Sequence, residues 1–157
     1  MSLPGVTPVV VRAAVDADLL YPEIGGAAGE YRAQLSAVMR STTAVVLIAE
    51  VDGEQVGRIT VDTTRVDADV SGFVVAEHRR RQGIGATLMD AAEAEALKQE
   101  CDRVRLTVAK DNVAALALYD ARGYERVGEA FSTGLRSPTG VRIHEPEPVW
   151  EMVKPVA

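Results

Sequence analysis

The chain has 157 residues, of which 47% are hydrophobic and 25% charged, and its formal net charge is −6. That length suits one domain with a proper core, so we expect residues 1–157 to form a single domain. An acidic chain with few aromatic residues does not fit a nucleic-acid-binding surface, which needs an extended basic face. Any anionic ligand should be small and locally bound, and the acidity modestly favours a cationic partner such as an amine.

The sequence offers little for redox or metal chemistry. Cys101 is the single cysteine, so no intrachain disulfide forms, and we interpret it as a structural thiol. His78 and His144 do not lie at ligand spacing from another soft donor, so no metal is predicted. No basic-then-apolar leader opens the chain, and its longest aliphatic run, 44–49, is too short to cross a bilayer. We therefore expect a cytoplasmic protein with neither a membrane nor a nucleic-acid partner.

The first half of the chain predicts mainly strands. Asp52-Gly53 between two β-branched runs is the strongest short-range signal for a hairpin. Asp16 or Asp18 is a candidate cap for a short helix, and residues 30–40 carry apolar side chains at helical spacing. The expected strands are, in chain order, 9–11, 44–51, 55–61 and 69–75.

The second half predicts helices that alternate with strands. One helix is expected from Ile84 to about Glu100, and another from Asp111 or Asn112 to a C-terminal glycine at Gly123. The expected strands are 103–108, 124–131 and 149–153. A strand, a helix and a strand in succession over 69–108 imply a parallel crossover. The Gly- and Pro-rich segment 132–148 does not resolve into elements.

A basic turn joins the strand 69–75 to the helix that begins at Ile84, with the pattern Arg80-x-x-Gly83-x-Gly85. Glycines let a backbone approach a bound group, and the first N–H groups of a helix favour an anion. The arginines at 79–81 supply charge for two-pronged hydrogen bonds to phosphate. The turn predicts a phosphate cradle, although such glycines can also serve close packing and an arginine run is often solvated.

Two better-known phosphate loops do not match this turn. The dinucleotide fingerprint requires a third glycine where the chain has Leu88. The P-loop requires Gly-Lys-Ser/Thr where the chain has Gly85-Ala86-Thr87. A different phosphate-binding class is therefore needed.

A second motif follows one strand later and reads Asn112-x-x-Ala115-x-x-Leu118-Tyr119-x-x-x-Gly123-Tyr124. Its spacing places Asn112 at a helix start and puts Ala115 and Tyr119 one turn apart on one face. That face could simply be core. Together, in this order, the two motifs resemble the coenzyme A motifs of the GNAT superfamily of N-acetyltransferases.

The resemblance spans nearly the whole chain and implies an α/β (α+β mixed) fold. The GNAT fold has a central mixed, largely antiparallel sheet with a splayed parallel strand pair and helices on both faces. In it the strand ending at Val75 diverges from the strand 103–108, and the pantetheine arm lies in the gap between them. The family often has Pro or Gly in the turn where this chain has 77–81, so the loop departs from the pattern.

The resemblance also implies how acetyl-coenzyme A, the cosubstrate, is held without a metal. The residues implied to bind its pantetheine and thioester through their backbones are Phe73, Val74 and Val75. Those implied to hold its pyrophosphate are Arg80 and the backbone amides of Arg81, Gln82, Gly83, Ile84, Gly85 and Ala86. Those implied beside its sulfur are Asn112, Ala115 and Tyr119.

The implied reaction transfers the acetyl group to a primary amine by direct attack in a ternary complex. An aliphatic amine has a pKa of about 10.4, so a base or a water chain must first remove a proton. Asp69, expected on the same face as Ser71, Phe73 and Val75, is the candidate base, although an Asp at a strand start is usually just solvated. Tyr119 is the candidate general acid for the thiolate, although its ring could merely pack.

Two other functions remain open from the sequence. One is a catalytically silent coenzyme A or acyl-coenzyme A binding module with a regulatory role. The other, a nucleotide-binding regulatory domain, is weaker because both nucleotide fingerprints fail. The acceptor, whether a small molecule or a peptide amine, is not specified, because residues 19–40 and 132–148 carry no diagnostic motif. A homodimer is the common default for such a chain.

Overall fold

The structure is a computed structural model that describes residues 8–20, 36, 38–63, 66–132, 135–136, 142–144 and 146–156. Its strands are β1 (Val10–Ala13), β2 (Ala44–Val51), β3 (Glu54–Asp62), β4 (Asp67–Val75), β5 (Arg103–Ala109), β6 (Glu125–Phe131), β7 (Leu135–Arg136), β8 (Arg142–His144) and β9 (Pro148–Pro155). Its helices are α2 (Ile84–Lys98), α3 (Val113–Ala121) and the short 3-10 turns η1 (Asp16–Leu20) and η2 (Glu77–Arg79).

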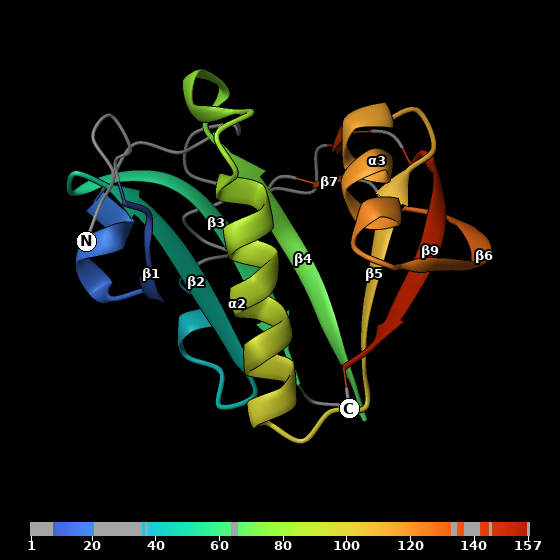
Figure 1. Cartoon of the computed structure of the whole chain (residues 1–157), viewed down its shortest axis with the longest axis horizontal. Coiled ribbons are helices and arrows are strands. Elements are labelled where there is room, and N and C mark those ends of the chain that lie inside the picture. Colours follow the sequence, from blue (N-terminus) through green and yellow to red (C-terminus); the bar gives the residue numbers. More distant parts are fainter. Residues whose placement is uncertain are drawn as a thin grey trace.

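Seven strands form one sheet in the order β1-β2-β3-β4-β5-β9-β6. Every neighbouring pair is antiparallel except β4 and β5, and α2 and α3 lie on one face of the sheet (Figure 1). The predicted fold class, a largely antiparallel mixed sheet with one parallel pair and helices, is confirmed. Of the helix expected at 30–40, the described residues Ser36, Val38 and Met39 are helical. Within the described ranges, no helix is long and apolar enough to span a membrane.

The core lies between the sheet and α2. The β2–β3 hairpin turns at Asp52 and Gly53, whose φ angles of 52° and 78° are those of the tight turn that the sequence predicts. On β3, a Cβ added at Gly57 would lie 2.9 Å from Cδ1 of Leu88 and 3.0 Å from the carbonyl oxygen of Val74. The absence of a side chain at Gly57 therefore lets α2 lie close on the sheet. Cys101 is buried at the edge of this core, as expected for a structural thiol.

A β-bulge in β4 turns its end away from β5. Gly72 and Phe73 together stand opposite the single residue Ile59 of β3, and Gly72 has a φ of 59° that favours glycine. The extra residue also shifts the alternation of side chains. Val70 before the bulge and Phe73 and Val75 after it all pack against the core under α2.

The parallel pairing of β4 and β5 is confined to one end of the two strands. Asp67–Asp69 align with Arg103–Arg105, and beyond this point the strands diverge, as Figure 1 shows. At the closed end, Arg103 donates to both oxygens of Asp67 at 3.1 and 2.9 Å, and Arg105 donates to the second of them at 3.3 Å. These contacts, led by the hydrogen bond from Arg103, hold the pKa of the Asp67 carboxyl below its ordinary value.

We expect Asp67→Asn to lower the melting temperature at neutral pH, because the substitution removes the charge that both arginines face. A carboxyl with a lowered folded pKa stabilises the fold above its unfolded pKa of about 3.9 and loses that contribution as the pH falls through the folded value. The difference between the two proteins should therefore be constant near neutrality and shrink below about pH 4. Thermal melts across the pH range measure this. A difference independent of pH would contradict the assignment.

Candidate active site

The N-terminus of α2 lacks a side-chain cap. Its N-cap residue is Gly83, with a φ of 81°, and no side chain of the described residues caps this end. The first helical bond runs from the amide of Thr87 to the carbonyl of Gly83 at 3.0 Å, so the amides before it have no partner within the helix. A Cβ at Gly83 would meet nothing within 4 Å. The positive end of the helix therefore has free amides and open space beside Gly83, which an anion could use.

Arg79 and Arg80, two of the three consecutive arginines before this helix, take different directions. Arg79 turns back to the β2–β3 hairpin, where its Nη2 lies 3.7 Å from a carboxylate oxygen of Glu54. His78 makes a closer contact of 2.9 Å with the other oxygen of Glu54. Arg80 instead directs its Nε to the carbonyl oxygen of Val75 at 3.4 Å, at the end of β4. Of these two arginines, Arg80 is the one placed at the open end of the strand pair.

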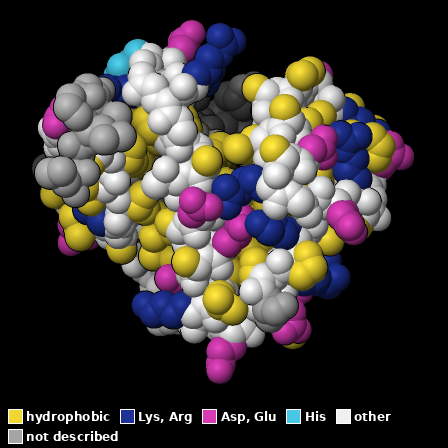
Figure 2. Space-filling view, in the orientation of Figure 1, with side chains coloured by type: hydrophobic (Ala, Val, Ile, Leu, Met, Phe, Trp, Pro, Cys, Tyr) yellow, Lys and Arg dark blue, Asp and Glu magenta, His cyan; other side chains and the backbone are white. Residues whose placement is uncertain are grey.

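Gly85 brings α2, β4 and α3 together. A Cβ at this position would lie 3.2 Å from Cζ of Phe73 and 3.7 Å from Cδ2 of Leu118. The close-packing role that the sequence left open for the second glycine is therefore observed at Gly85. In the space-filling view the molecule is hollowed at its upper edge, between the loop before α2 and the lobe that carries α3 (Figure 2).

Tyr119 lies on α3 against the end of β4. Asn112 caps this helix by accepting from the amide of Ala115 at 3.2 Å, as its position predicts. The Tyr119 ring is 5% exposed and packs edge-on between Phe73 and Tyr124, with centroids 6.5 and 5.7 Å away. Burial raises the pKa of its phenol to about 12, so the hydroxyl carries its proton throughout the physiological range.

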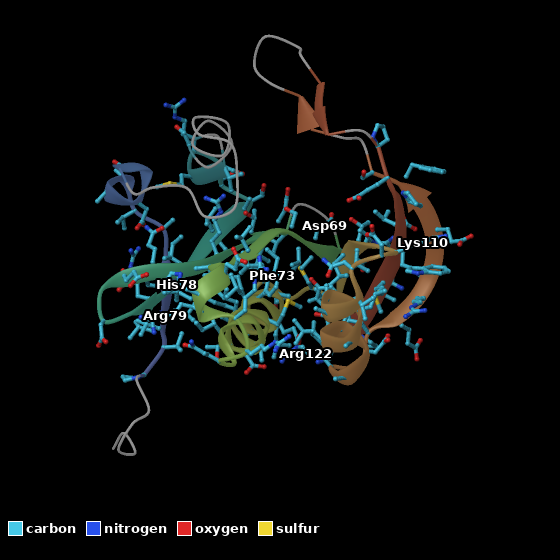
Figure 3. The ribbon with its side chains drawn as sticks, turned by 90° about the horizontal axis from the view of Figure 1, so that it is seen from above. Asp69, Phe73, His78, Arg79, Lys110 and Arg122 are labelled. Atoms are coloured by element: carbon cyan, nitrogen blue, oxygen red, sulfur yellow. The ribbon has the colours of Figure 1, made fainter. Side chains whose placement is uncertain are left out.

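The structure does not place Asp69 where the sequence suggested. Asp69 and Ser71 share a face of β4, but the bulge moves Phe73 and Val75 to the opposite face, under α2. Figure 3, viewed from above the sheet, shows Phe73 toward the helices and Asp69 away from them. The expectation of one shared face was wrong because counting by twos ignores a bulge. Among the described residues, no group of three or more His, Cys, Asp or Glu side chains could hold a metal ion.

Comparison with known proteins identifies the family of the chain. A model of the acetyltransferase (GNAT) family matches residues 16–124, which is more than half of the sequence. The chain belongs to the GNAT acetyltransferase family. This membership makes it an acyltransferase, and it confirms the family that the two motifs indicated.

The relatives of this GNAT acetyltransferase are distant. The uncharacterized protein YdhI of Bacillus subtilis (strain 168) is 33% identical to this chain over 73 residues. The matched segment is 46% of this chain and 44% of YdhI, so the chain spans less than half the length of that relative. The ribosomal-protein-S18-alanine N-acetyltransferase of Escherichia coli superposes with a TM-score of 0.74 at 16% identity, over 96% of this chain and 95% of that one. A Bacillus anthracis str. Ames protein assigned as a streptothricin acetyltransferase was solved with acetyl coenzyme A. It superposes with a TM-score of 0.75 at 17% identity, over 94% of this chain and 99% of that one. At these identities the two solved structures show a shared fold.

The described part of this GNAT acetyltransferase contains a half-buried polar cluster around Glu93 that the sequence did not reveal. Glu93 of α2 accepts from Nη2 of Arg122 at 3.0 Å, from the hydroxyl of Tyr124 at 3.1 Å and from Nζ of Lys154 at 2.6 Å. These contacts join α2 to the end of α3 and to β9. Nothing local in the sequence points to partners so far along the chain.

We expect Gly85→Val to abolish acetyl-coenzyme A binding and to destabilise the fold by about 1–3 kcal/mol, the usual range for overpacking. The added methyl groups would push against Phe73 and Leu118, which the glycine now lets approach. Calorimetric titration and chemical denaturation measure the two effects. Gly128→Val is the matched control, because a Cβ there also meets an atom at 3.2 Å, the carboxylate of Glu151, but on β6. A folded Gly85→Val protein with unchanged affinity would contradict this account.

Proposed function

We propose that this protein transfers an acetyl group from acetyl-coenzyme A to a primary amine by direct attack in a ternary complex. The observation that carries the proposal is the convergence of three groups at the open end of the β4–β5 pair. They are the uncapped N-terminus of α2, the Arg80 side chain and the buried Tyr119 phenol. The solved relatives add support, since one contains acetyl coenzyme A and the other is named an alanine N-acetyltransferase.

The residues of this site fit a coenzyme A group. Beyond Asp69, the edge of β4 that faces β5 has no strand partner in the described part of the chain, so the backbone groups of residues 73–75 that face this edge are available to the pantetheine amides, apart from the Val75 carbonyl, which accepts from Arg80. Arg80 and the backbone amides of residues 81–86 would hold the pyrophosphate, in the open space beside Gly83. Asn112 uses its side-chain oxygen to cap α3, which leaves its NH₂ group for the ligand.

The chain's own groups suit the proton transfers that this reaction requires. Bound acetyl-coenzyme A would supply the thioester carbon; the C–N bond forms there as the C–S bond breaks. Burial keeps the Tyr119 phenol protonated, and we propose that its hydroxyl donates a hydrogen bond to the departing sulfur and passes it a proton as the C–S bond breaks. Asp69 lies on the other face of the sheet, from which an amine could reach the gap, and we propose it as the base that accepts the amine proton.

Release of free thiol across a library of amines tests the proposed function. The library should contain aliphatic polyamines, amino acids, aminoglycosides and peptides with free N-termini, each incubated with the protein and acetyl-coenzyme A. We expect at least one class to raise thiol release above the rate of hydrolysis, with the acetylated amine detected by mass spectrometry. If acetyl-coenzyme A binds and no amine is acetylated, the protein is the silent binding module.

We expect Arg80→Ala to weaken acetyl-coenzyme A binding on the order of tenfold at low salt, equivalent to about 1.4 kcal/mol, and by less at high salt. The reason is that dissolved ions screen an exposed contact between a guanidinium and a phosphate. Calorimetric titration over a series of salt concentrations measures the effect. Arg79→Ala is the control, because Arg79 faces Glu54 and its loss should leave affinity nearly unchanged. Equal losses in the two variants would show that the loop acts only through its net charge.

We expect Tyr119→Phe to fold and to bind acetyl-coenzyme A as the parent does, but to lose on the order of 10²-fold in turnover. Phenylalanine preserves the ring contacts with Phe73 and Tyr124 and removes only the proton donor. Steady-state kinetics with the acceptor found above measures the loss. Turnover within about twofold of the parent, with chemistry rate-limiting, would remove Tyr119 from the mechanism.

A further inference from the structure

The C-terminal end of α3 places a second tyrosine directly against Tyr119. Gly123 follows the helix with a φ of 90°, and the amide of Tyr124 then donates back to the carbonyl of Tyr119 at 3.0 Å. This is the Schellman arrangement, in which the residue after the glycine contacts the last turn of the helix. The two rings consequently meet edge-on with centroids 5.7 Å apart. That contact needs only a ring at position 124.

The hydroxyl of Tyr124 has a separate partner. It donates to Oε2 of Glu93 at 3.1 Å, and Glu93 is itself held by Arg122 at 3.0 Å and by Lys154 at 2.6 Å. The Glu93 side chain is 13% exposed, so this hydrogen bond is largely shielded from water. Tyr124 is therefore fixed at both ends, by the helix cap at its backbone and by a paired carboxylate at its hydroxyl.

Among the described residues, the Tyr119 hydroxyl makes no comparable hydrogen bond to an anchored partner. Its ring is 5% exposed overall and is held by edge-on packing between Phe73 and Tyr124. Phe73 in turn packs closely against α2 at Gly85. The contact is so tight that a Cβ added to Gly85 would lie only 3.2 Å from Cζ of Phe73. How firmly the Tyr119 hydroxyl is aimed thus depends on how firmly its two neighbours are held. Small misplacements of a reacting group are costly, about 10²-fold for 1 Å.

We propose that Tyr124, anchored through its hydroxyl to Glu93, is a positioning residue that aims the Tyr119 hydroxyl during acetyl transfer. This inference rests on the proposed function, since it assigns Tyr119 a proton to deliver. The other contacts of this cluster do not require the Tyr124 hydroxyl. Without it, Glu93 keeps both Arg122 and Lys154, and a phenylalanine keeps the contact that caps α3.

A double-mutant cycle with Tyr124→Phe and Tyr119→Phe tests the proposal, with kcat and the KM for acetyl-coenzyme A measured for all four proteins. We expect Tyr124→Phe to lower kcat about fivefold to tenfold and to leave KM within about twofold, because only the aim of the proton donor changes. In the Tyr119→Phe background, the same substitution should have no further effect on kcat, because the hydroxyl that it positions is gone.

The cycle separates this proposal from the proposed function. An equal loss of kcat in both backgrounds, or no loss in either, would overturn the positioning role while leaving acetyl transfer and Tyr119 untouched. A Tyr119→Phe protein with full turnover would refute the general acid itself, and with it the role of Tyr124. Asp120→Asn is the matched control: it removes an exposed ion pair with Arg126 from the same helix, and kcat should not change.

Discussion

The candidate active site depends on where β4 stops pairing with β5. Asp67–Asp69 align with Arg103–Arg105, and the ion pairs of Asp67 hold that end closed. The bulge at Gly72 then bends β4, so the two strands cannot continue side by side. Beyond Asp69 this edge of β4 has no strand partner among the described residues, so its backbone groups can pair with an extended ligand. A pantetheine arm, which carries amides of its own, is such a ligand.

Opening a sheet in this way leaves two halves that must be held at a fixed separation. On the helix face, Glu93 of α2 joins the two halves through its hydrogen bonds with Arg122, Tyr124 and Lys154. Nearer the open end, the ring of Tyr119 meets Phe73 of β4 across the gap. The α2 N-terminus, proposed to hold the pyrophosphate, and Tyr119 of α3, the proposed proton donor, therefore belong to different halves. Their relative placement is decided by a few contacts that cross between them.

Much of the fold could be predicted because its signals are local. The Asp52-Gly53 turn, the Asn112 cap and the glycine after α3 each depend on the backbone preference of one or two residues. The features that were missed depend on register or on distant partners. The bulge at Gly72 places Asp69 on a different face from Phe73, and alternation alone cannot reveal it. The partners of Glu93 lie 29 to 61 residues further along the chain, and only the folded sheet brings them together.

Calorimetric titration with acetyl-coenzyme A, coenzyme A, ATP and NAD tests most directly whether the opened strand pair is a coenzyme A site. The account predicts that both pantetheine-bearing ligands bind and compete with each other, because they share the contacts along β4 and at the start of α2. ATP and NAD carry the phosphates without the pantetheine arm, so they should bind far more weakly. Binding of ATP or NAD at least as tight as that of acetyl-coenzyme A would contradict the account.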